Sequence, residues 1–334
     1  MKNLDLETYR CPACRGQLSL KNERVAQEAE VERGQLTCTV CGMAYPIVNA
    51  IPRFAPESNY AESFGLEWAM FPRTLLDENW QSSYKDRFFR TTDFPQSLSG
   101  QKVLEVGCGP GNFTGIILGT GARLFSFDLS NAVDACRQNS RIWTHRHLLS
   151  LSQSDIAALP FAYGSFDKIV CLGVIQHCPD PENAFSCLCR FLKPGGEIVI
   201  DCYQKQPFPR ASVIHMTKHL LRMITKRMPP RTLFHAVRGG ICKTYDVKMA
   251  LSKIPRVGNA LHRVIPIGKL KRYDWNPEQM KQIKTLNVFD MLSPMYDFPQ
   301  RLETVRNWIM NERLELIKCD LGYNGINAKA RRPI

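Results

Sequence analysis

The sequence predicts an α/β protein in which helices cover both faces of a doubly wound parallel sheet. Short apolar runs that end in acids or glycines alternate with helical patterns through the middle of the chain, and this alternation is typical of such sheets. A small cysteine-bearing segment precedes the alternating region, and a basic segment interrupts it. With 334 residues, 44% of them hydrophobic, the chain is long enough to bury a full core.

Individual elements follow from this alternation. Strands are expected at 102–106, 123–127, 166–172 and 197–201, with a further strand before Asp155. Helices are expected at 112–118, 131–138 and 181–192. After the basic segment, the pattern predicts a helix at 300–311 and two closing strands at 314–320 and 325–330.

Three domains are expected: a small cysteine-bearing domain at 1–55, an aromatic-rich helical lid or linker at 56–100, and an α/β domain at 101–334 with a basic helical insertion at about 205–290. In the second of these, Tyr60, Phe64, Trp68 and Phe71 fall on one helical face. These aromatic side chains either pack into the core or form a lid over a neighbouring site.

The net charge of +13 is concentrated in one segment. Residues 205–272 contain 16 lysines and arginines and a single acid, Asp246. This imbalance indicates an anionic partner, which could be RNA, a phosphate-bearing acceptor or a membrane surface. The alternative is a solvated helical surface.

Part of this segment has the pattern of a basic amphipathic helix. We expect an apolar stripe and, on another face, three basic side chains. The stripe consists of Val213, Met216, Leu220, Ile224 and Met228, and the basic face of Lys218, Arg222 and Lys226.

The sequence favours a cytoplasmic location. No segment approaches the roughly 18 consecutive apolar residues of a spanning helix, and Met1–Arg10 has no apolar signal-peptide core. The 13 cysteines are therefore expected to be thiols or metal ligands instead of disulfides. The basic segment leaves open an association with the periphery of a membrane.

Cys11, Cys14, Cys38 and Cys41 form two C-x2-C pairs separated by 23 residues. Each pair fits one turn of a zinc knuckle, and four thiolates complete a closed, structural Zn²⁺ site. A redox dithiol is less suitable, because it needs one pair only and usually begins a helix. The residues that follow, Cys41–Ile47 and Ile51–Phe54, resemble the small zinc-ribbon activator family that partners tRNA and protein methyltransferases.

A glycine-rich turn, Gly107-Cys108-Gly109-Pro110-Gly111, follows an apolar strand and precedes a helix. It lacks the Gly-Lys-Ser/Thr end of a phosphate loop, and Asn112 replaces the third small residue of a dinucleotide fingerprint. Nineteen residues past Gly109, Asp128 ends the next strand, where a carboxylate can accept ribose hydroxyls.

The order of these motifs resembles the class I S-adenosylmethionine-dependent methyltransferase family. Further matches are Leu159-Pro160-Phe161, the strand beginning Ser165-Phe166-Asp167, and Leu192-Lys193-Pro194-Gly195-Gly196. The resemblance covers about 64–334 and implies a seven-stranded Rossmann-like sheet with S-adenosylmethionine as cofactor. The alternative is a domain that binds another adenosine compound or none.

The resemblance also implies the cofactor-binding residues. The three glycines would line the methionine end of the cofactor, Glu105 would lie near its amino group, Asp128 would hold the ribose, and Asp155 with Ile156 would contact the adenine. The complete expected set is Glu105, Gly107, Gly109, Gly111, Asp128, Leu129, Asp155, Ile156 and Leu172.

The loop at 173–179 would face the methyl group. It lacks the Asn/Asp-Pro-Pro-aromatic motif of enzymes that methylate base amines. His177 is the candidate general base for a hydroxyl or amine, or else a structural histidine. Cys178 is better explained as a core residue than as a nucleophile, because several other cysteines of this domain also fall in core positions.

Two functions remain open at this point. The first is O- or N-methylation of a small or carrier-linked anionic metabolite, such as a glycan, lipid or natural-product precursor. The second is methylation of tRNA or rRNA, with the ribbon and residues 205–272 binding the nucleic acid. The basic segment offers few aromatic side chains for base stacking, mainly Phe234, Tyr245 and Tyr273. A catalytically silent scaffold is a third possibility, which the intact glycine-rich motif argues against.

Overall fold

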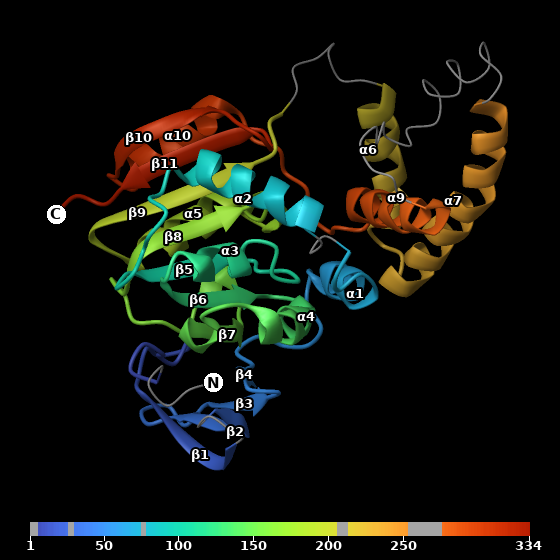
Figure 1. Cartoon of the computed structure of the whole chain (residues 1–334). Helices are drawn as coiled ribbons and strands as arrows, with labels where there is room; N and C mark the ends of the chain where they lie inside the picture. The colour runs from blue at the N-terminus through green and yellow to red at the C-terminus, as the bar shows by residue number, and fades with distance from the viewer. Residues whose placement is uncertain (1–5, 26–29, 75–77, 206–212, 253–275) are drawn as a thin grey trace. The chain divides into compact units, whose positions relative to one another are not determined.

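The computed structural model describes residues 6–25, 30–74, 78–205, 213–252 and 276–334. The chain divides into two compact units, and each is considered by itself (Figure 1). Unit 1 comprises Met1–Lys205 and Tyr296–Ile334, and unit 2 comprises Gln206–Met295.

Among the described residues of unit 1, seven strands form one sheet. In spatial order they are β10 (Glu315–Leu321), β11 (Ile326–Arg331), β9 (Leu192–Cys202), β8 (Phe166–Leu172), β5 (Lys102–Val106), β6 (Arg123–Asp128) and β7 (Leu149–Gln153). The five strands from β9 to β7 are parallel, whereas β11 is antiparallel to both of its neighbours. From β5, the strands β6 and β7 are added on one side, and β8 and β9 on the other. This order confirms the doubly wound sheet.

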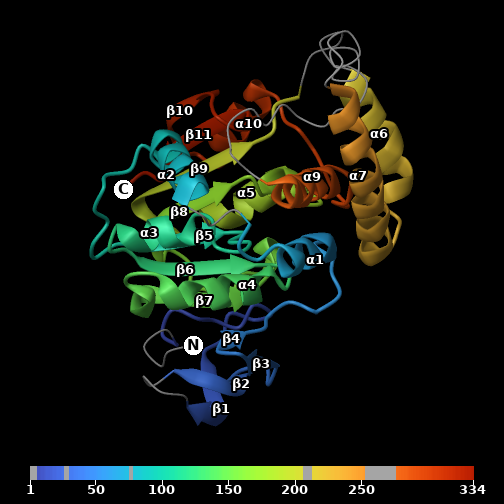
Figure 2. The same ribbon diagram turned by 45° about the vertical axis from the view of Figure 1, so that its right-hand side comes forward.

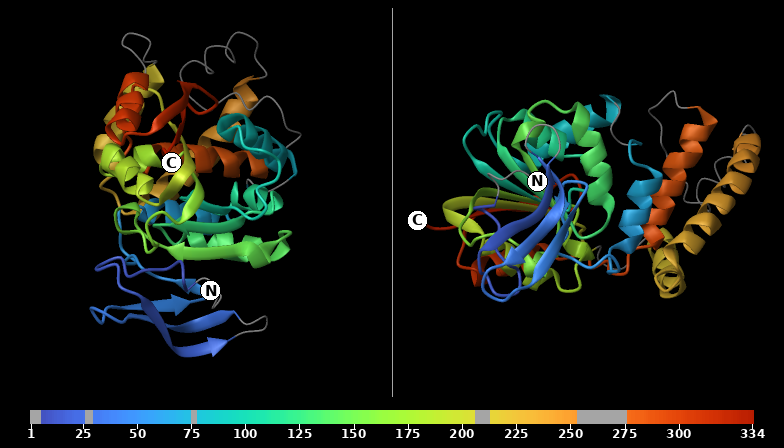
Figure 3. Two further views of the ribbon diagram at one scale, coloured as in Figure 1. Left: turned by 90° about the vertical axis from the view of Figure 1, so that its left-hand side faces the viewer. Right: turned by 90° about the horizontal axis from the view of Figure 1, so that it is seen from below.

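Helices cover both faces of this sheet (Figure 3). They are α2 (Glu78–Thr92), α3 (Thr114–Gly119) and α4 (Ala132–Asn139) on one face, and α5 (Pro181–Cys189) and α10 (Leu302–Asn311) on the other. Val103 of β5 belongs to the core that α2, α3 and α4 complete. Its neighbour Leu104 belongs to the core that α5 and α10 complete, as the alternation of side chains along a strand requires.

Two of the expected boundaries near β9 were wrong. The helix expected to reach residue 192 ends at Cys189, and the strand expected at 197 begins at Leu192. Leu192 pairs with Phe166 of β8 and Glu197 pairs with Lys168, and the register shift between these two pairs accommodates the additional residues of β9, which include Pro-Gly-Gly. Backbone pairing thus extends the strand through residues whose types are typical of a turn.

The cysteine-bearing segment folds as a separate antiparallel sheet next to β7 (Figure 2). Its strands, in order, are β1 (Leu18–Val25), β2 (Val31–Cys38), β3 (Ala44–Val48) and β4 (Ile51–Pro52). The amide of Phe54 donates to the carbonyl of Gln153 at the end of β7, at 2.8 Å. Tyr9, which precedes β1, forms an antiparallel bridge with Phe161 between β7 and β8, so the cysteine-bearing segment also contacts this connection.

The aromatic-rich segment forms α1 (Glu62–Met70), followed by α2. Gly65 of α1 packs against the backbone of Asn131, where a Cβ would lie 3.2 Å from the amide nitrogen. The side chain of Asn59 donates to the carbonyl of Leu129, at 3.1 Å. The segment is therefore held beside the carboxyl end of β6.

Unit 2 contains α6 (Val213–Thr225), α7 (Pro230–Ser252) and α9 (Pro277–Leu292) among its described residues. Asn276 and Gln279 form a capping box at the start of α9, which satisfies amides that have no partner within the helix. The rings of Phe234 and Phe289 lie 5.6 Å apart and join α7 to α9. The parts of the basic segment at 206–212 and 253–272 lie outside the described residues.

The expected basic face of α6 was wrong in one respect. Arg222 is buried, and it donates to the carbonyls of Met291 and Pro294 at the end of α9. Leu220 and Ile224, two members of the expected apolar stripe, are 64% and 68% exposed. The last carbonyls of a helix have no partner within the helix. The guanidinium of Arg222 has five donors and stabilises the carbonyls at the end of α9, so Arg222 lies on the buried side of α6. No helix in the described part of the chain is both long enough and apolar enough to cross a membrane.

Candidate active site and metal centre

The four expected metal ligands come together in the small sheet. The Sγ atoms of Cys11, Cys14, Cys38 and Cys41 all lie within 4.8 Å of one another. The Cys11–Cys41 and Cys14–Cys38 sulfur distances are 3.7 and 3.4 Å. A tetrahedral zinc ion with Zn–S bonds of about 2.3 Å holds its sulfurs about 3.8 Å apart. The donor set therefore fits Zn²⁺.

The backbone around Cys38 favours its thiolate. Hydrogen bonds from the amides of Cys41 and Val40 to its sulfur lower the pKa of Cys38 to about 6. A Cβ on Gly16 would lie 2.9 Å from the same sulfur, so glycine permits the first knuckle to approach the second. These contacts orient a metal ligand before any ion binds.

The glycine-rich turn between β5 and α3 depends on all three of its glycines. Gly107, Gly109 and Gly111 have φ angles of 68°, 52° and 101°, which side chains rarely permit. A Cβ on Gly107 would lie 2.5 Å from a methyl group of Val174, and one on Gly111 would overlap the ring of Trp143. The three positions therefore have no room for side chains. A loop without side chains allows a ligand to approach its main-chain amides.

Asp128 connects the end of β6 to this loop. One carboxylate oxygen accepts from the amide of Gly109 at 2.9 Å, and the other accepts from the amide and hydroxyl of Ser130. Burial raises the pKa of Asp128, and the three hydrogen bonds oppose this effect. A carboxylate has about four acceptor positions, so roughly one remains for a ligand hydroxyl. This vacant acceptor beside the glycines fits the ribose role implied by the sequence.

Glu105 is buried one residue before the end of β5. Its Oε2 accepts from the hydroxyls of Ser126 and Thr114, at 2.5 and 2.7 Å. Burial raises the pKa of Glu105 to about 7, although these hydrogen bonds lower it. Because Oε2 is occupied internally, only Oε1 could accept from a ligand ammonium group.

The remaining expected cofactor residues lie at the carboxyl ends of neighbouring strands. One oxygen of Asp155 accepts from the amide of Ala157 at 2.9 Å and caps a short 3-10 turn that contains the buried Ile156. Leu129 follows β6, and Leu172 ends β8 as a buried residue. Their roles toward a cofactor stay predictions.

His177 lies after β8 in a ring of aromatic side chains. Its Nδ1 is 3.0 Å from the carbonyl oxygen of Tyr296. The rings of Phe64 and Tyr203 lie 5.1 and 5.7 Å from the imidazole, both edge to face. Because a carbonyl only accepts, Nδ1 must carry the proton, and in a neutral ring Nε2 then has the free lone pair.

The aromatic face of α1 takes part in this site. The ring of Tyr60, just before the helix, lies 5.4 Å from that of Tyr296. The indole nitrogen of Trp68 would be 3.4 Å from a Cβ on Gly109. The segment therefore contacts both the candidate base and the glycine-rich turn, and its role as a lid stays a prediction.

Several site residues were missed by sequence reasoning. Arg87 of α2 donates to the buried carboxylate of Asp201 at 2.7 Å, and Asn324 donates to its other oxygen at 3.4 Å. Asp201 is near the end of β9, where an acid could have been suspected, but nothing in the sequence connects it to Arg87. The side-chain amide of Gln176 is fully buried, and neither of its polar atoms has a hydrogen-bond partner in the part of the chain that the structure describes.

Cys178 is buried, in surroundings that disfavour a thiolate nucleophile. Burial raises the pKa of its thiol to about 12, and the hydrogen bond with Tyr60 lowers it only in part. The structure thus agrees with its interpretation as a core residue.

Comparisons with known proteins agree with this architecture. Residues 104–200 match the family model described as a methyltransferase domain, and residues 6–49 match that of Trm112p-like protein. A ubiquinone biosynthesis O-methyltransferase from Methylococcus capsulatus is 29% identical over 135 residues, which cover 39% of this chain and 55% of that protein. An uncharacterized protein from Synechococcus is 26% identical over 72% of this chain and 53% of its own length.

The chain thus spans about half the length of these curated relatives. Among solved structures, the N-methyltransferase NodS from Bradyrhizobium japonicum, in complex with S-adenosyl-L-homocysteine, is 16% identical; the match covers 83% of this chain and 100% of that chain, with a TM-score of 0.45. The sequence matches and the cysteine cluster lead to one conclusion: this chain carries a Trm112p-like zinc-ribbon domain and a methyltransferase domain in a single polypeptide.

Proposed function

We propose that the chain transfers a methyl group from S-adenosylmethionine to a hydroxyl oxygen of an acceptor bound beside His177. The observation that carries the proposal is the contact between His177 Nδ1 and the Tyr296 carbonyl. This contact leaves Nε2 as the proton acceptor that a hydroxyl needs and a free amine does not. The curated relative named an O-methyltransferase supports the same choice.

The bound cofactor would supply an electrophilic methyl group on a sulfonium. The glycine-rich turn would hold its methionine end, and the free acceptor position of Asp128 would bind a ribose hydroxyl. His177 would take the acceptor proton as the new carbon–oxygen bond forms. Phe64, Tyr203 and the α1 segment would exclude water and align the two reactants, which is the main requirement of such a displacement.

The surroundings of His177 support an acceptor with a flat apolar ring that carries the hydroxyl. Tyr60, Phe64, Tyr203, Tyr296 and Phe298 surround the imidazole or contact one another beside it. Aromatic pairs prefer edge-to-face or offset contacts, and a phenolic ring offers the same surface. The relatives named for ubiquinone biosynthesis support this acceptor class.

RNA methylation receives less support. Phe234 and Tyr245, two of the three aromatic residues expected to stack on bases, are 2% and 5% exposed. Single-stranded RNA is usually held by exposed aromatic rings. We therefore do not include RNA in the proposal.

Methyl transfer from labelled S-adenosylmethionine tests the proposal. The purified protein would be given catechol-type phenols, the matching anilines, and total RNA in parallel. We expect labelled methyl ethers from the phenols only. Labelling of the anilines at a similar rate, or of RNA alone, would contradict the proposed reaction.

We also propose that α6 and the start of α7 dock on an anionic lipid surface. Leu220, Leu221, Met223 and Ile224 are between 47% and 68% exposed. Lys226, Arg227 and Arg231 follow and are also exposed, and the sequence from Lys218 to Lys243 contains no acid. Exposed apolar side chains beside exposed cations fit an interface of acyl chains and anionic headgroups.

Sedimentation with vesicles tests this surface. We expect binding to phosphatidylglycerol vesicles and little binding to phosphatidylcholine vesicles. The double variant Leu220→Ser/Ile224→Ser should weaken binding by roughly tenfold or more, since each apolar side chain removed from water contributes about 1.5–3 kcal/mol. Val247→Ser, on the exposed surface of α7, is the matched control. Equal binding to both lipids, or no effect of the double variant, would contradict the proposal.

A further inference from the structure

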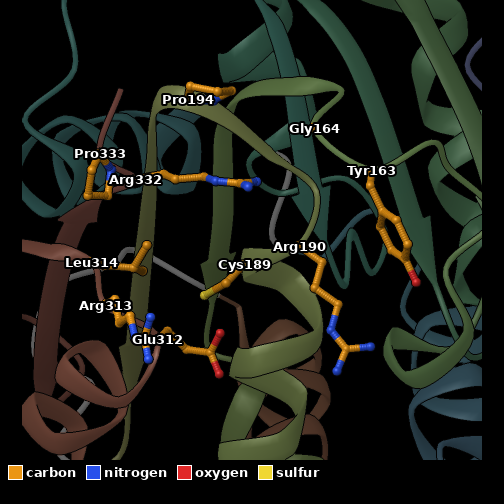
Figure 4. Close-up of a pocket in the computed structure, with 10 residues that line it drawn as sticks. All are labelled: Tyr163, Gly164, Cys189, Arg190, Pro194, Glu312, Arg313, Leu314, Arg332 and Pro333. Atoms are coloured by element: carbon orange, nitrogen blue, oxygen red, sulfur yellow. The ribbon is translucent and has the colours of Figure 1, made fainter.

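A cavity lies in unit 1 at the amino ends of the parallel strands. Its volume is about 720 Å³. It is lined by Gly164 before β8, Pro194 near the start of β9, and residues at the ends of α5 and α10 (Figure 4). The glycine-rich turn follows the carboxyl end of β5, so the cavity is at the opposite edge of the sheet. The volume is in the range that holds molecules of nucleotide size.

Three arginines from different elements line this cavity. Arg190 follows α5, Arg313 follows α10, and Arg332 follows β11. Glu312 is the one acid among the lining residues, so the lining carries a net positive charge. Within the described residues, the guanidinium groups of Arg190 and Arg313 have no ion pair or hydrogen bond with the protein.

The third arginine is fixed in place. The guanidinium of Arg332 donates to the carbonyl of Leu192 at 2.7 Å. Its amide donates to Gly196, and its carbonyl accepts from Gly195. The guanidinium of Arg332 is thus positioned by the backbone of β9. The guanidinium groups of Arg190 and Arg313 are available to bind a ligand.

An aromatic ring adjoins the charged side chains. Tyr163 lines the cavity and is 52% exposed. The guanidinium of Arg15 lies 4.8 Å from the centre of its ring, and Arg15 is held by a hydrogen bond to the carbonyl of Leu159 at 2.6 Å. Arg15 thus covers one face of this ring, and the ring of Phe191 lies 5.3 Å from it. The exposed part of the Tyr163 side chain and three cations line the same cavity.

We propose that this cavity binds a phosphate-bearing small molecule of nucleotide size. The planar donor fork of arginine matches phosphate oxygens, and several forks favour a ligand with more than one phosphate. The exposed part of the Tyr163 side chain provides an apolar contact for an attached ring. The proposal uses none of the residues assigned to methyl transfer and does not depend on that activity.

Titration calorimetry of the full chain with inorganic triphosphate tests the site. This probe contains no adenosine, so the expected cofactor site does not recognise it. We expect one binding event that weakens about tenfold or more in Arg190→Ala/Arg313→Ala, because charge-assisted hydrogen bonds are lost. Arg90→Ala is the matched control, since Arg90 is exposed and pairs with Asp86 on α2. Circular dichroism would verify that both variants are folded.

A second titration distinguishes a nucleotide from free phosphate. Adenosine triphosphate, added with saturating S-adenosylhomocysteine, should bind more tightly than triphosphate if Tyr163 stacks on the base, and Tyr163→Ala should remove the difference. Equal affinities would assign the site to phosphate groups alone. Unchanged triphosphate binding in the double arginine variant, an equal loss in Arg90→Ala, or displacement of triphosphate by S-adenosylhomocysteine would overturn the proposal.

Discussion

The ring of Tyr9 in the ribbon lies 5.3 Å from the ring of Phe161 in the methyltransferase domain. Tyr9 is fully buried and also contacts Phe125 of β6, at 6.3 Å. The buried side chains of the ribbon and of one sheet face form a continuous core. The ribbon is therefore part of the folded core and does not behave as a tethered accessory.

Removal of zinc should consequently destabilise the methyltransferase domain as well as the ribbon. We expect Cys38→Ser to lose zinc and to lower the melting temperature of the whole of unit 1, because structural zinc contributes directly to folding. Calorimetric melting with elemental analysis would measure both effects. Cys187→Ser, a partly exposed cysteine of α5, serves as control. A full zinc content in Cys38→Ser would contradict the assignment.

Asp128 should anchor the cofactor. Asp128→Ala removes the acceptor for a ribose hydroxyl and for the amide of Gly109, which should cost about 1.5–3 kcal/mol, or roughly ten- to hundredfold in affinity for S-adenosylmethionine. Calorimetric titration would measure this change. Asp86→Ala, on the exposed side of α2, should leave the affinity unchanged. Equal affinity in wild type and Asp128→Ala would remove the assignment.

Much of unit 1 was predictable because its signals are local. The strands around Gly107 and Asp128 are short apolar runs followed by turn residues, and such runs specify buried parallel strands. The two cysteine pairs are also a local signal, because the two-residue spacing within each pair is that of a zinc knuckle. The glycine-rich turn needs positive φ angles at three positions. Glycine is the residue that most readily adopts them, so the three glycines indicate this backbone conformation.

The contacts that were not predictable join residues distant in the chain. The tautomer of His177 depends on the carbonyl of Tyr296, 119 residues later. Every residue has a backbone carbonyl, so residue types do not indicate which carbonyl accepts. Arg222 was placed on an exposed face because of its charge, yet the end of α9 provides acceptors that compensate its burial. Tertiary hydrogen bonds override residue type in both cases.

His177 should be required for turnover and not for cofactor binding. His177→Gln keeps a polar side chain of similar size but cannot take the acceptor proton. We expect kcat for a phenolic acceptor to fall about 10²- to 10⁴-fold, with the affinity for S-adenosylmethionine preserved. His235→Gln, an exposed histidine of α7, is the control. Undiminished turnover in His177→Gln would show that the histidine is structural.

Arg222 should stabilise unit 2. Arg222→Ala would leave the carbonyls of Met291 and Pro294 without their donor in a buried position. The expected loss is about 1.5–3 kcal/mol of unfolding free energy. Urea unfolding would measure it, with Arg238→Ala on the exposed surface of α7 as the control. Equal stabilities of the two variants would mean that this contact contributes nothing.

Glu105 should make the stability of the protein decrease as the pH rises. Burial raises its pKa to about 7 from the ordinary value of 4.5, so between these values the folded chain retains a proton that the unfolded chain releases. Stability that is present below about pH 4.5 is therefore lost as the pH rises through about 7, after which it stays constant. The full effect is at most about 3 kcal/mol.

Glu105→Gln isolates this effect. The glutamine oxygen can still accept from Ser126 and Thr114 but does not titrate, so the decrease should disappear. Between about pH 5 and pH 8, the wild type should lose about 2–3 kcal/mol of unfolding free energy relative to the variant. Urea unfolding at several pH values would measure both proteins, and Glu57→Gln, at an exposed position, should follow the wild type. Because cysteine and histidine titrations are shared, they cancel in this difference, and parallel pH profiles for wild type and Glu105→Gln would mean that Glu105 is ionised over this whole range.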